Sequence, residues 1–179
     1  MKTLVVYTSQ TGFTKKYAGW LVEKTGADLF DVKDVQKKPD SFFADYGAIV
    51  YAGWVMAGKV VKANWLFSKA PSWNDKRLAV VAVGGCPNEA PEVEQALKTI
   101  VPDELKSKIP AFYCQGGFNY AKMNTASKMA LKMFIGMLKG RKNQTEDQKR
   151  MVELISHDYD IADPKFLEPV VQHIEGQEA

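Results

Sequence analysis

The chain has 179 residues, of which 46% are hydrophobic and 25% charged, and two of them are cysteines. This length fits one domain with a sizeable core. No apolar run is long enough for a membrane-spanning helix, and the short apolar run after the charged start does not fit a signal peptide. Two cysteines without a close-spaced partner exclude a disulfide scaffold and a zinc site. We therefore expect a single cytoplasmic domain, residues 1–179, with reduced thiols.

The formal charge of +3 conceals an asymmetry along the chain. Between Leu105 and Thr145 there is no Asp or Glu, whereas eight basic residues occur: Lys106, Lys108, Lys122, Lys128, Lys132, Lys139, Arg141 and Lys142. The rest of the chain has 16 basic and 21 acidic residues, a net charge of −5. One end of the molecule is therefore expected to be basic and the remainder acidic.

Short apolar, β-branched runs alternate with helical patterns along the first two thirds of the chain. Strands are expected at 4–7, 27–32, 48–52, 78–83 and 109–114, and helices at 17–24, 60–67 and 91–100. This alternation predicts an α/β fold with a parallel sheet and helices on both faces. Further helices are expected at 123–139, 145–156 and 164–174, as a helical C-terminal extension over 123–175. The second of these begins with a capping pattern, Thr145 followed by Gln148.

The turn between the first strand and the first helix is rich in hydroxyl groups. It reads Thr8, Ser9, Gln10, Thr11, Gly12, Phe13 and Thr14. Free N–H groups and the helix dipole at such a turn favour binding of an anion. The turn lacks both the Gly-Lys-Ser/Thr ending of nucleoside triphosphate loops and the Gly-x-Gly-x-x-Gly of dinucleotide sites. We therefore expect it to bind the single terminal phosphate of a mononucleotide, the alternative being that Thr11 simply caps the helix.

Further turns should lie at the same edge of the sheet, where open parallel sheets bind ligands. One follows the third strand and contains Ala52, Gly53, Trp54, Val55 and Gly58; its glycines suit close approach to a flat ring on which Trp54 would stack. The alternative is that Trp54 covers the core. A second contains Gly84, Gly85, Cys86 and Asn88 and would contact the other edge of the ring. The alternative is a plain turn into the next helix. The turn at 115–120 is expected to be flexible.

Together these turns resemble those of the flavodoxin-like family. The segment from Thr8 to Thr14 resembles, residue by residue, the family's phosphate loop for flavin mononucleotide (FMN), Thr/Ser-x-Thr-Gly-x-Thr. The turns at 53–58 and 84–88 fall where the family's two isoalloxazine-contacting loops fall. The resemblance covers about residues 1–120. It implies a flavodoxin-like three-layer α/β sandwich, a five-stranded parallel sheet in the order 2-1-3-4-5, and non-covalently bound FMN.

The chain also departs from the family pattern. Phe13 stands where a small or polar residue is usual, and the basic segment contrasts with the acidic surface of small electron-carrying flavodoxins. In size, in its Gly-Gly turn and in the basic helix that follows, the chain is similar to flavodoxin-like protoporphyrinogen dehydrogenases. That resemblance implies an FMN-dependent oxidoreductase that passes electrons between a donor and a quinone- or porphyrinogen-type molecule. An electron shuttle without its own substrate, or a flavin-free phosphate-binding module, are the alternatives.

The segment 122–142 combines lysines with methionines. On a helical wheel Lys128, Lys132 and Lys139 lie together, opposite a face formed by Met123, Ala126, Ala130, Met133, Phe134 and Met137. Such a helix can make peripheral contact with an anionic membrane surface, or hold an apolar ligand or a protein redox partner. The alternative is an ordinary helix whose apolar face packs on the sheet. Nucleic-acid binding is not favoured, because aromatic residues are scarce among the lysines.

The remaining reactive side chains point to no chemistry of their own. His157 and His173 are expected at the surface and not on a metal. Cys86 and Cys114 are expected to be small buried thiols, a redox pair at the ligand end being the alternative. No catalytic acid, base or nucleophile can be named from the sequence.

Overall fold

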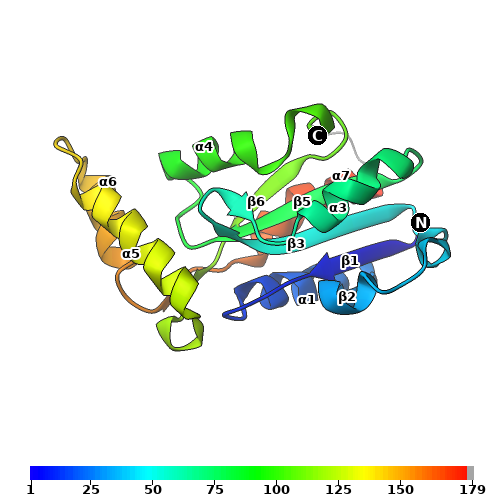
Figure 1. Cartoon of the computed structure of the whole chain (residues 1–179), viewed down its shortest axis with the longest axis horizontal. Helices are drawn as coiled ribbons and strands as arrows, with labels where there is room; N and C mark the ends of the chain where they lie inside the picture. The colour runs from blue at the N-terminus through cyan, green and yellow to red at the C-terminus, as the bar shows by residue number, and fades with distance from the viewer. Residues whose placement is uncertain (177–179) are drawn as a thin grey trace.

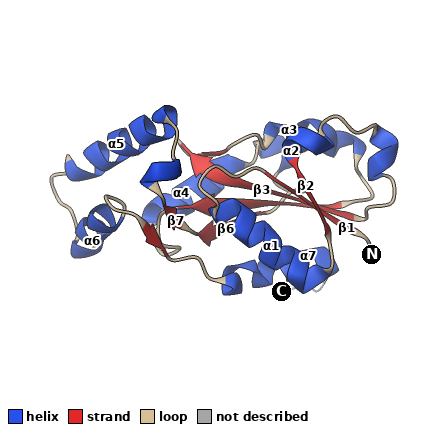
Figure 2. Ribbon diagram, turned by 90° about the horizontal axis from the view of Figure 1, so that it is seen from below, coloured by secondary structure: helices blue, strands red, loops and turns tan. Residues whose placement is uncertain are grey.

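The computed structural model describes residues 1–176, which form a central sheet covered by helices on both faces (Figure 1, Figure 2). Its parallel strands are β1 (Thr3–Tyr7), β2 (Asp28–Asp31), β3 (Ala48–Met56), β5 (Arg77–Gly84) and β6 (Ala111–Gln115). They lie in the order β2-β1-β3-β5-β6, and the short β4 (Lys59–Val60) pairs antiparallel with the end of β3. The expected order 2-1-3-4-5 of the parallel strands, and the flavodoxin-like sandwich, are therefore confirmed.

Two helical layers bury the faces of this sheet. Helices α1 (Phe13–Thr25) and α7 (Glu168–Glu175) cover one face, and α2 (Val32–Val35), α3 (Asn64–Lys69) and α4 (Pro91–Ile100) cover the other. Strand β3 supplies both cores in alternation: Val50 packs toward α1 and α7, whereas Ile49 and Tyr51 pack toward α3. The unbroken apolar run of this strand follows from its burial on both sides.

The chain after β3 differs from the sequence expectation. Residues expected as a loop at 53–58 continue β3 as far as Met56, and the chain then turns back into β4. The turn is tight because Ala57 and Gly58 both have positive φ, 49° and 74°, as in the commonest two-residue hairpins. The helix expected from residue 60 therefore begins only at Asn64.

The C-terminal segment lies beyond the carboxyl ends of the strands, where α5 (Thr125–Lys139) and α6 (Glu146–Leu154) form a hairpin (Figure 1). The expected capping box of Thr145 and Gln148 is confirmed. The extension is not wholly helical, however, because β8 (Tyr159–Asp160) pairs antiparallel with β7 (Gly117–Phe118). The turn expected to be flexible at 115–120 is thus partly a strand. The remaining elements are 3-10 helices: Asp40–Phe43, Ala70–Ser72, Asp103–Leu105, Tyr120–Lys122 and Pro164–Leu167.

Helix α5 packs on α6, so the alternative of an ordinary helix whose apolar face packs on the sheet is wrong. Leu138 of α5 joins Met151, Val152 and Ile155 in a small separate core, against which Phe134 is partly buried. The opposite side of α5 is open to solvent. Among the described residues, no helix combines the length and apolarity needed to cross a bilayer.

Candidate functional site

The turn after β1 lies where the order of the strands reverses. Strand β1 lies between β2 and β3. The chain passes from β1 to β2 on one side, and then crosses to β3 on the other side. This is the point at which open α/β sheets bind ligands. The amide of Thr8 donates to the carbonyl of Ala52 over 3.0 Å, which ties the turn to β3.

Helix α1 begins in a way that suits an anion. Gly12 is its N-cap residue, with φ of 105°, and no side chain caps the helix. The alternative in which Thr11 caps α1 is therefore wrong. The first N–H groups of a helix have no partner within it, and without a capping side chain they are available to a bound anion.

The hydroxyl of Ser9 is the second sign of a missing partner. Its Oγ is buried and has no hydrogen-bond partner among the described residues, a costly state for a polar group. Thr14 is also buried, in the first turn of α1. A phosphate placed at this turn would supply acceptors to the helix and to Ser9. The residues present therefore fit a phosphate group.

The second predicted turn, after β3, forms the end of the β3–β4 hairpin. Gly53 is needed for the close return of the chain, because a Cβ there would lie 2.6 Å from Cγ1 of Val60. Trp54 is half-buried, and its indole Nε1 is buried without a hydrogen-bond partner among the described residues. Gly58 serves the hairpin turn. The structure thus gives both glycines a role in the backbone, and it places Ala52, Trp54 and Val55 on one strand beside the phosphate turn.

The third predicted turn, 84–88, is held by two tyrosine hydroxyls. Tyr113 donates to the carbonyl of Cys86 over 2.8 Å, and Tyr159 donates to the carbonyl of Gly85. Burial raises the pKa of both phenols, so both remain protonated donors. Gly85 makes room for the ring of Phe118, which a Cβ at that position would strike. Phe118 therefore packs on this turn beside Tyr113 and Tyr159.

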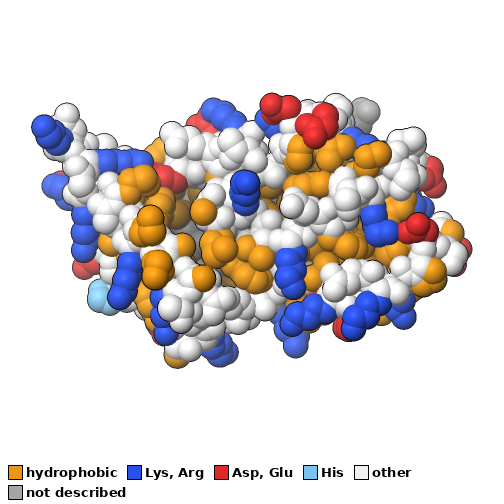
Figure 3. Space-filling view, in the orientation of Figure 1, with side chains coloured by type: hydrophobic (Ala, Val, Ile, Leu, Met, Phe, Trp, Pro, Cys, Tyr) orange, Lys and Arg blue, Asp and Glu red, His pale blue; other side chains and the backbone are white. Residues whose placement is uncertain are grey.

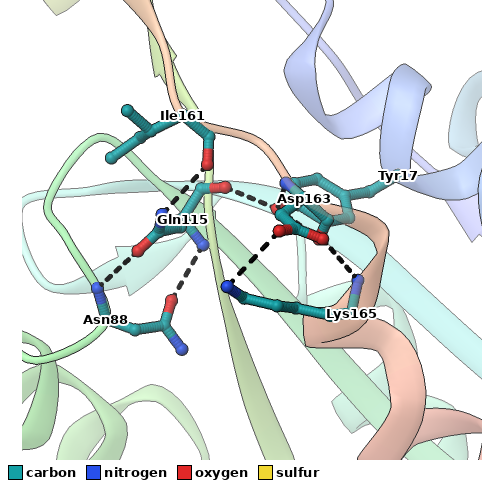
Figure 4. Close-up of polar contacts among 6 residues, drawn as sticks. All are labelled: Tyr17, Asn88, Gln115, Ile161, Asp163 and Lys165. Atoms are coloured by element: carbon teal, nitrogen blue, oxygen red, sulfur yellow. Dashed lines mark hydrogen bonds and ion pairs between the residues drawn. The ribbon is translucent and has the colours of Figure 1, made fainter.

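A pair of amides fixes the end of the same turn (Figure 4). The amide N–H of Asn88 donates to Oε1 of Gln115 over 3.0 Å, and the amide N–H of Gln115 donates to Oδ1 of Asn88 over 3.0 Å. The side chain of Gln115 also donates to the carbonyl of Ile161 over 3.0 Å. Gln115 therefore joins the turn at 84–88 to the segment that follows β8.

That segment is in turn anchored to α1. The hydroxyl of Tyr17 donates to the carbonyl of Gln115 over 2.5 Å and accepts from the amide of Asp163 over 3.0 Å (Figure 4). Burial raises the pKa of Tyr17. Lys16 pairs with Asp160 at 2.8 Å. The phosphate turn, the turn at 84–88 and residues 159–163 thus form one connected structure.

The thiols and imidazoles lie outside this arrangement. Cys86 and Cys114 are free and pack into different cores, and burial raises the pKa of each thiol to about 12. Both are therefore protonated and weakly reactive. The expectation of a buried thiol is confirmed for Cys114, whereas Cys86 is only partly buried. His157 is exposed as predicted, but His173 is half-buried, with Nε2 3.1 Å from the carbonyl oxygen of Leu78. Within residues 1–176 no cluster of possible metal ligands occurs.

Sequence reasoning missed the residues that support the turns. Tyr17, Tyr113, Gln115 and Tyr159 come from three elements, α1, β6 and β8, and Tyr159 lies 74 residues from its partner Gly85. Each has an ordinary local sequence context. The pairing of β7 with β8, which brings Tyr159 beside Phe118, could have indicated Tyr159 alone.

Comparison with known proteins gives one decisive match: residues 4–145 match the family model of the flavodoxin domain. A flavodoxin domain implies a flavin cofactor. No curated protein matches the chain.

Several solved structures are similar at low sequence identity. The Trp repressor binding protein from Bacillus subtilis has 14% identity and a TM-score of 0.47, over 80% of this chain and 100% of that one. A WrbA-like flavodoxin from Agrobacterium tumefaciens has 15% identity and a TM-score of 0.40, over 87% and 97%. A flavodoxin from the domain Archaea has 16% identity and a TM-score of 0.38, over 87% and 95%. With scores this low, the assignment rests on the family model.

Proposed function

The chain belongs to the flavodoxin-domain family, and we propose that it binds FMN and acts as an FMN-dependent oxidoreductase. The observation that carries this proposal is the uncapped start of α1 together with the unpartnered Oγ of Ser9. These groups suit one phosphate, and the turn lacks the glycines that a dinucleotide needs. We therefore assign the phosphate to residues 9–14.

We assign the flavin ring to the two turns beside the phosphate site. Ala52, Gly53, Trp54, Val55 and Gly58 would lie on one side of it, and Gly84, Gly85, Cys86 and Asn88 on the other. A bound flavin supplies the electron-transfer chemistry, and the protein supplies binding and orientation. The turn at 84–88 is held by Tyr113, Tyr159 and Gln115. They keep its carbonyl and amide groups in fixed positions, so the turn needs little ordering when the cofactor binds.

As electron acceptor we propose a small quinone- or porphyrinogen-type molecule. The alternative is an electron shuttle that serves only a protein partner. A shuttle for basic partners would have an acidic surface, whereas the acid-free segment 105–145 gives this chain a basic end. The location is proposed to be the cytoplasm.

The test is a flavin titration followed by mixing with acceptors. Protein freed of cofactor is titrated with FMN and with riboflavin, and the flavin bands at roughly 375 and 450 nm are followed. We expect FMN to bind at least about a hundredfold more tightly than riboflavin, because riboflavin lacks the phosphate. Hydrogen bonds to the charged phosphate should contribute about 2–3 kcal/mol to the binding free energy. Equal affinities, or no binding of either flavin, would contradict the proposal.

The acceptor is tested with the photoreduced protein under anaerobic conditions. Rapid oxidation by a soluble quinone that saturates with quinone concentration supports the enzyme. Slow oxidation that stays linear with concentration would instead favour the shuttle. The variant Ser9→Ala is expected to weaken FMN binding about tenfold while leaving riboflavin binding unchanged, which separates the phosphate contact from a general loss of structure.

A further inference from the structure

Helix α5 presents a row of methionines to solvent. Met129, Met133 and Met137 are 60%, 70% and 53% exposed. They are spaced by four residues, so they lie above one another on one side of the helix. Within residues 1–176 the other large hydrophobic side chains that are exposed are Met1 and Met56. Met56 is at the tip of the β3–β4 hairpin, with its Sδ 3.8 Å from Oγ of Ser127 in α5.

Met129, Met133 and Met137 form one apolar surface, which we call the methionine face, whereas Met56 lies against Ser127 on another side of the helix. Figure 3 shows hydrophobic side chains along this end of the molecule, beside Lys and Arg side chains. A concentration of exposed large apolar side chains in one place marks an interaction surface more often than chance. The other side of α5, with Ser127, Leu131 and Leu138, is the side that packs on the protein. The methionine face is therefore not the packing side of this helix.

A row of lysines borders the methionine face. Lys128, Lys132 and Lys139 lie on the side of α5 between its buried residues and its methionines, and none of them forms an ion pair with another described residue. The acids nearest in the chain, Glu146 and Asp147, pair with Lys149 and Arg150 of their own helix. The positive charge beside the methionines is therefore not neutralised from within the molecule.

We propose that α5 docks on the surface of an anionic lipid bilayer. A helix that lies in the interface needs an apolar side to enter the acyl region and basic side chains to meet the headgroup phosphates. The methionine face and the lysine row provide these on adjoining sides of one helix. Flexible methionine side chains adapt to an irregular apolar surface, and long lysine side chains can reach sideways to the headgroups.

Charge favours a bilayer over a second copy of the chain as the occupant. A symmetric dimer across α5 would bring two copies of the same acid-free, basic surface together, and like charges at an interface are repulsive. An anionic bilayer offers the complementary charge instead. The α5–α6 hairpin stands at the carboxyl end of the sheet (Figure 2), so a docked molecule would hold that end toward the lipid.

The experiment is sedimentation of the full chain with vesicles. One set of vesicles is phosphatidylcholine alone, and the other is equal parts of phosphatidylcholine and phosphatidylglycerol. We expect binding to the anionic vesicles only, with most of it lost in about 0.5 M NaCl, where screening shortens the reach of the charges. The triple variant Lys128→Glu, Lys132→Glu, Lys139→Glu should lower the partition coefficient more than about tenfold.

Two further variants complete the design. The triple variant Met129→Ser, Met133→Ser, Met137→Ser should lower binding while leaving the charge unchanged. The control variant Lys24→Glu, Lys33→Glu, Lys37→Glu makes the same change in net charge on other elements and should bind as the parent does. Far-UV circular dichroism and the melting temperature confirm that each variant is folded.

The outcomes are decisive in both directions. Equal binding to neutral and anionic vesicles, no binding to either, or an equal loss in the control variant would overturn the proposal. Light scattering is run on the same samples. A dimer that becomes a monomer in the methionine variant would show that a second copy covers the face, and would overturn it as well. The FMN titration is independent of these measurements, so the two proposals can fail separately.

Discussion

The turns at the carboxyl edge of the sheet and the α5–α6 hairpin (residues 125–154) lie at the same end of the molecule but are held in different ways. The turns are tied to the two main cores by buried tyrosines and by backbone hydrogen bonds. The hairpin has a small core of its own, on which Cys86, Phe118 and Tyr159 also pack, and one ion pair to α4, Arg141 with Glu92 at 2.7 Å. We therefore expect the hairpin to open at a lower free energy than the sheet.

The strongest test of this difference is the same deletion made in both regions. Leu66 of α3 and Leu138 of α5 are equally buried. Leu66→Ala should lower the global free energy of unfolding by about 2–5 kcal/mol, because it leaves a cavity in a main core. Leu138→Ala should lower it by less than about 1 kcal/mol and act mainly on the hairpin. Urea unfolding measures the first effect, and amide hydrogen exchange of residues 125–154 measures the second.

Equal losses of global stability would contradict the comparison, because they would mean that the hairpin and the sheet unfold as one unit. FMN affinity is the second readout. It should change little in Leu138→Ala under conditions where the sheet is folded, since Cys86 is the proposed flavin contact that packs on the hairpin core.

The next test concerns the backbone of the phosphate turn. Gly12→Ala should cost about 1–3 kcal/mol, because φ of 105° is unfavourable for a residue with a Cβ. The site has open space for the added carbon, so strain and not a clash is the cause. We expect a lower melting temperature and FMN affinity reduced about tenfold, a change worth about 1.4 kcal/mol.

Gly19 provides the matched control for Gly12. It lies inside the same helix, has no atom near its would-be Cβ, and has no positive φ. Gly19→Ala should therefore stabilise the protein by up to about 1 kcal/mol through helix propensity. If both substitutions changed stability by the same amount in the same direction, the strain at Gly12 would not be real.

The sheet could be predicted from the sequence because its signals are local. The apolar run Ala48–Ala52 is long enough and β-branched enough to indicate a doubly buried strand. The phosphate turn combines hydroxyls and glycine between a strand and a helix, a pattern whose physical role is independent of the rest of the chain. Neither the strand nor the position of this turn needed tertiary information to predict, and that the turn binds a phosphate remains a prediction.

The parts that were predicted wrongly depend on tertiary contacts. The extension of β3 to Met56 requires Lys59 and Val60 to pair with it, and the glycines at 53 and 58 look like loop residues when this pairing is unknown. Helix α5 has two apolar sides, and only the position of α6 decides which one is buried. The wheel could not distinguish the buried Leu138 from the exposed Met137.

A smaller effect is expected at the hydroxyls that hold the turn at 84–88. Tyr113→Phe removes the hydrogen bond to the carbonyl of Cys86 and should cost about 0.5–1.5 kcal/mol. Tyr159→Phe removes the bond to the neighbouring carbonyl of Gly85 and should cost a similar amount. Since the two carbonyls are adjacent, the double variant should lose a different amount from the sum of the single losses. Additive losses, measured by urea unfolding, would show that the two bonds hold the turn independently.

The smallest effect concerns the ion pair of Lys16 and Asp160, which joins α1 to β8. Burial acts to raise the pKa of Asp160, but the hydrogen bonds from Lys16 and from the amide of Ala162 outweigh it, so the pKa lies below its usual range. The ionised carboxylate therefore stabilises the fold above about pH 4, the unfolded pKa, and this stability is lost as the pH falls through the folded pKa.

Asp160→Asn should remove this pH-dependent contribution. Both side chains are about half exposed, so the loss at pH 7 should be less than about 1 kcal/mol. The difference in unfolding free energy between parent and variant should shrink from pH 6 toward about pH 3, as the parent loses its carboxylate charge. A difference that stays constant over this range would mean that the charge of Asp160 does not hold β8 to α1. The connection between the turns would then depend on the hydrogen bonds of Tyr17, Gln115 and Tyr159, none of which involves a group that ionises in this range.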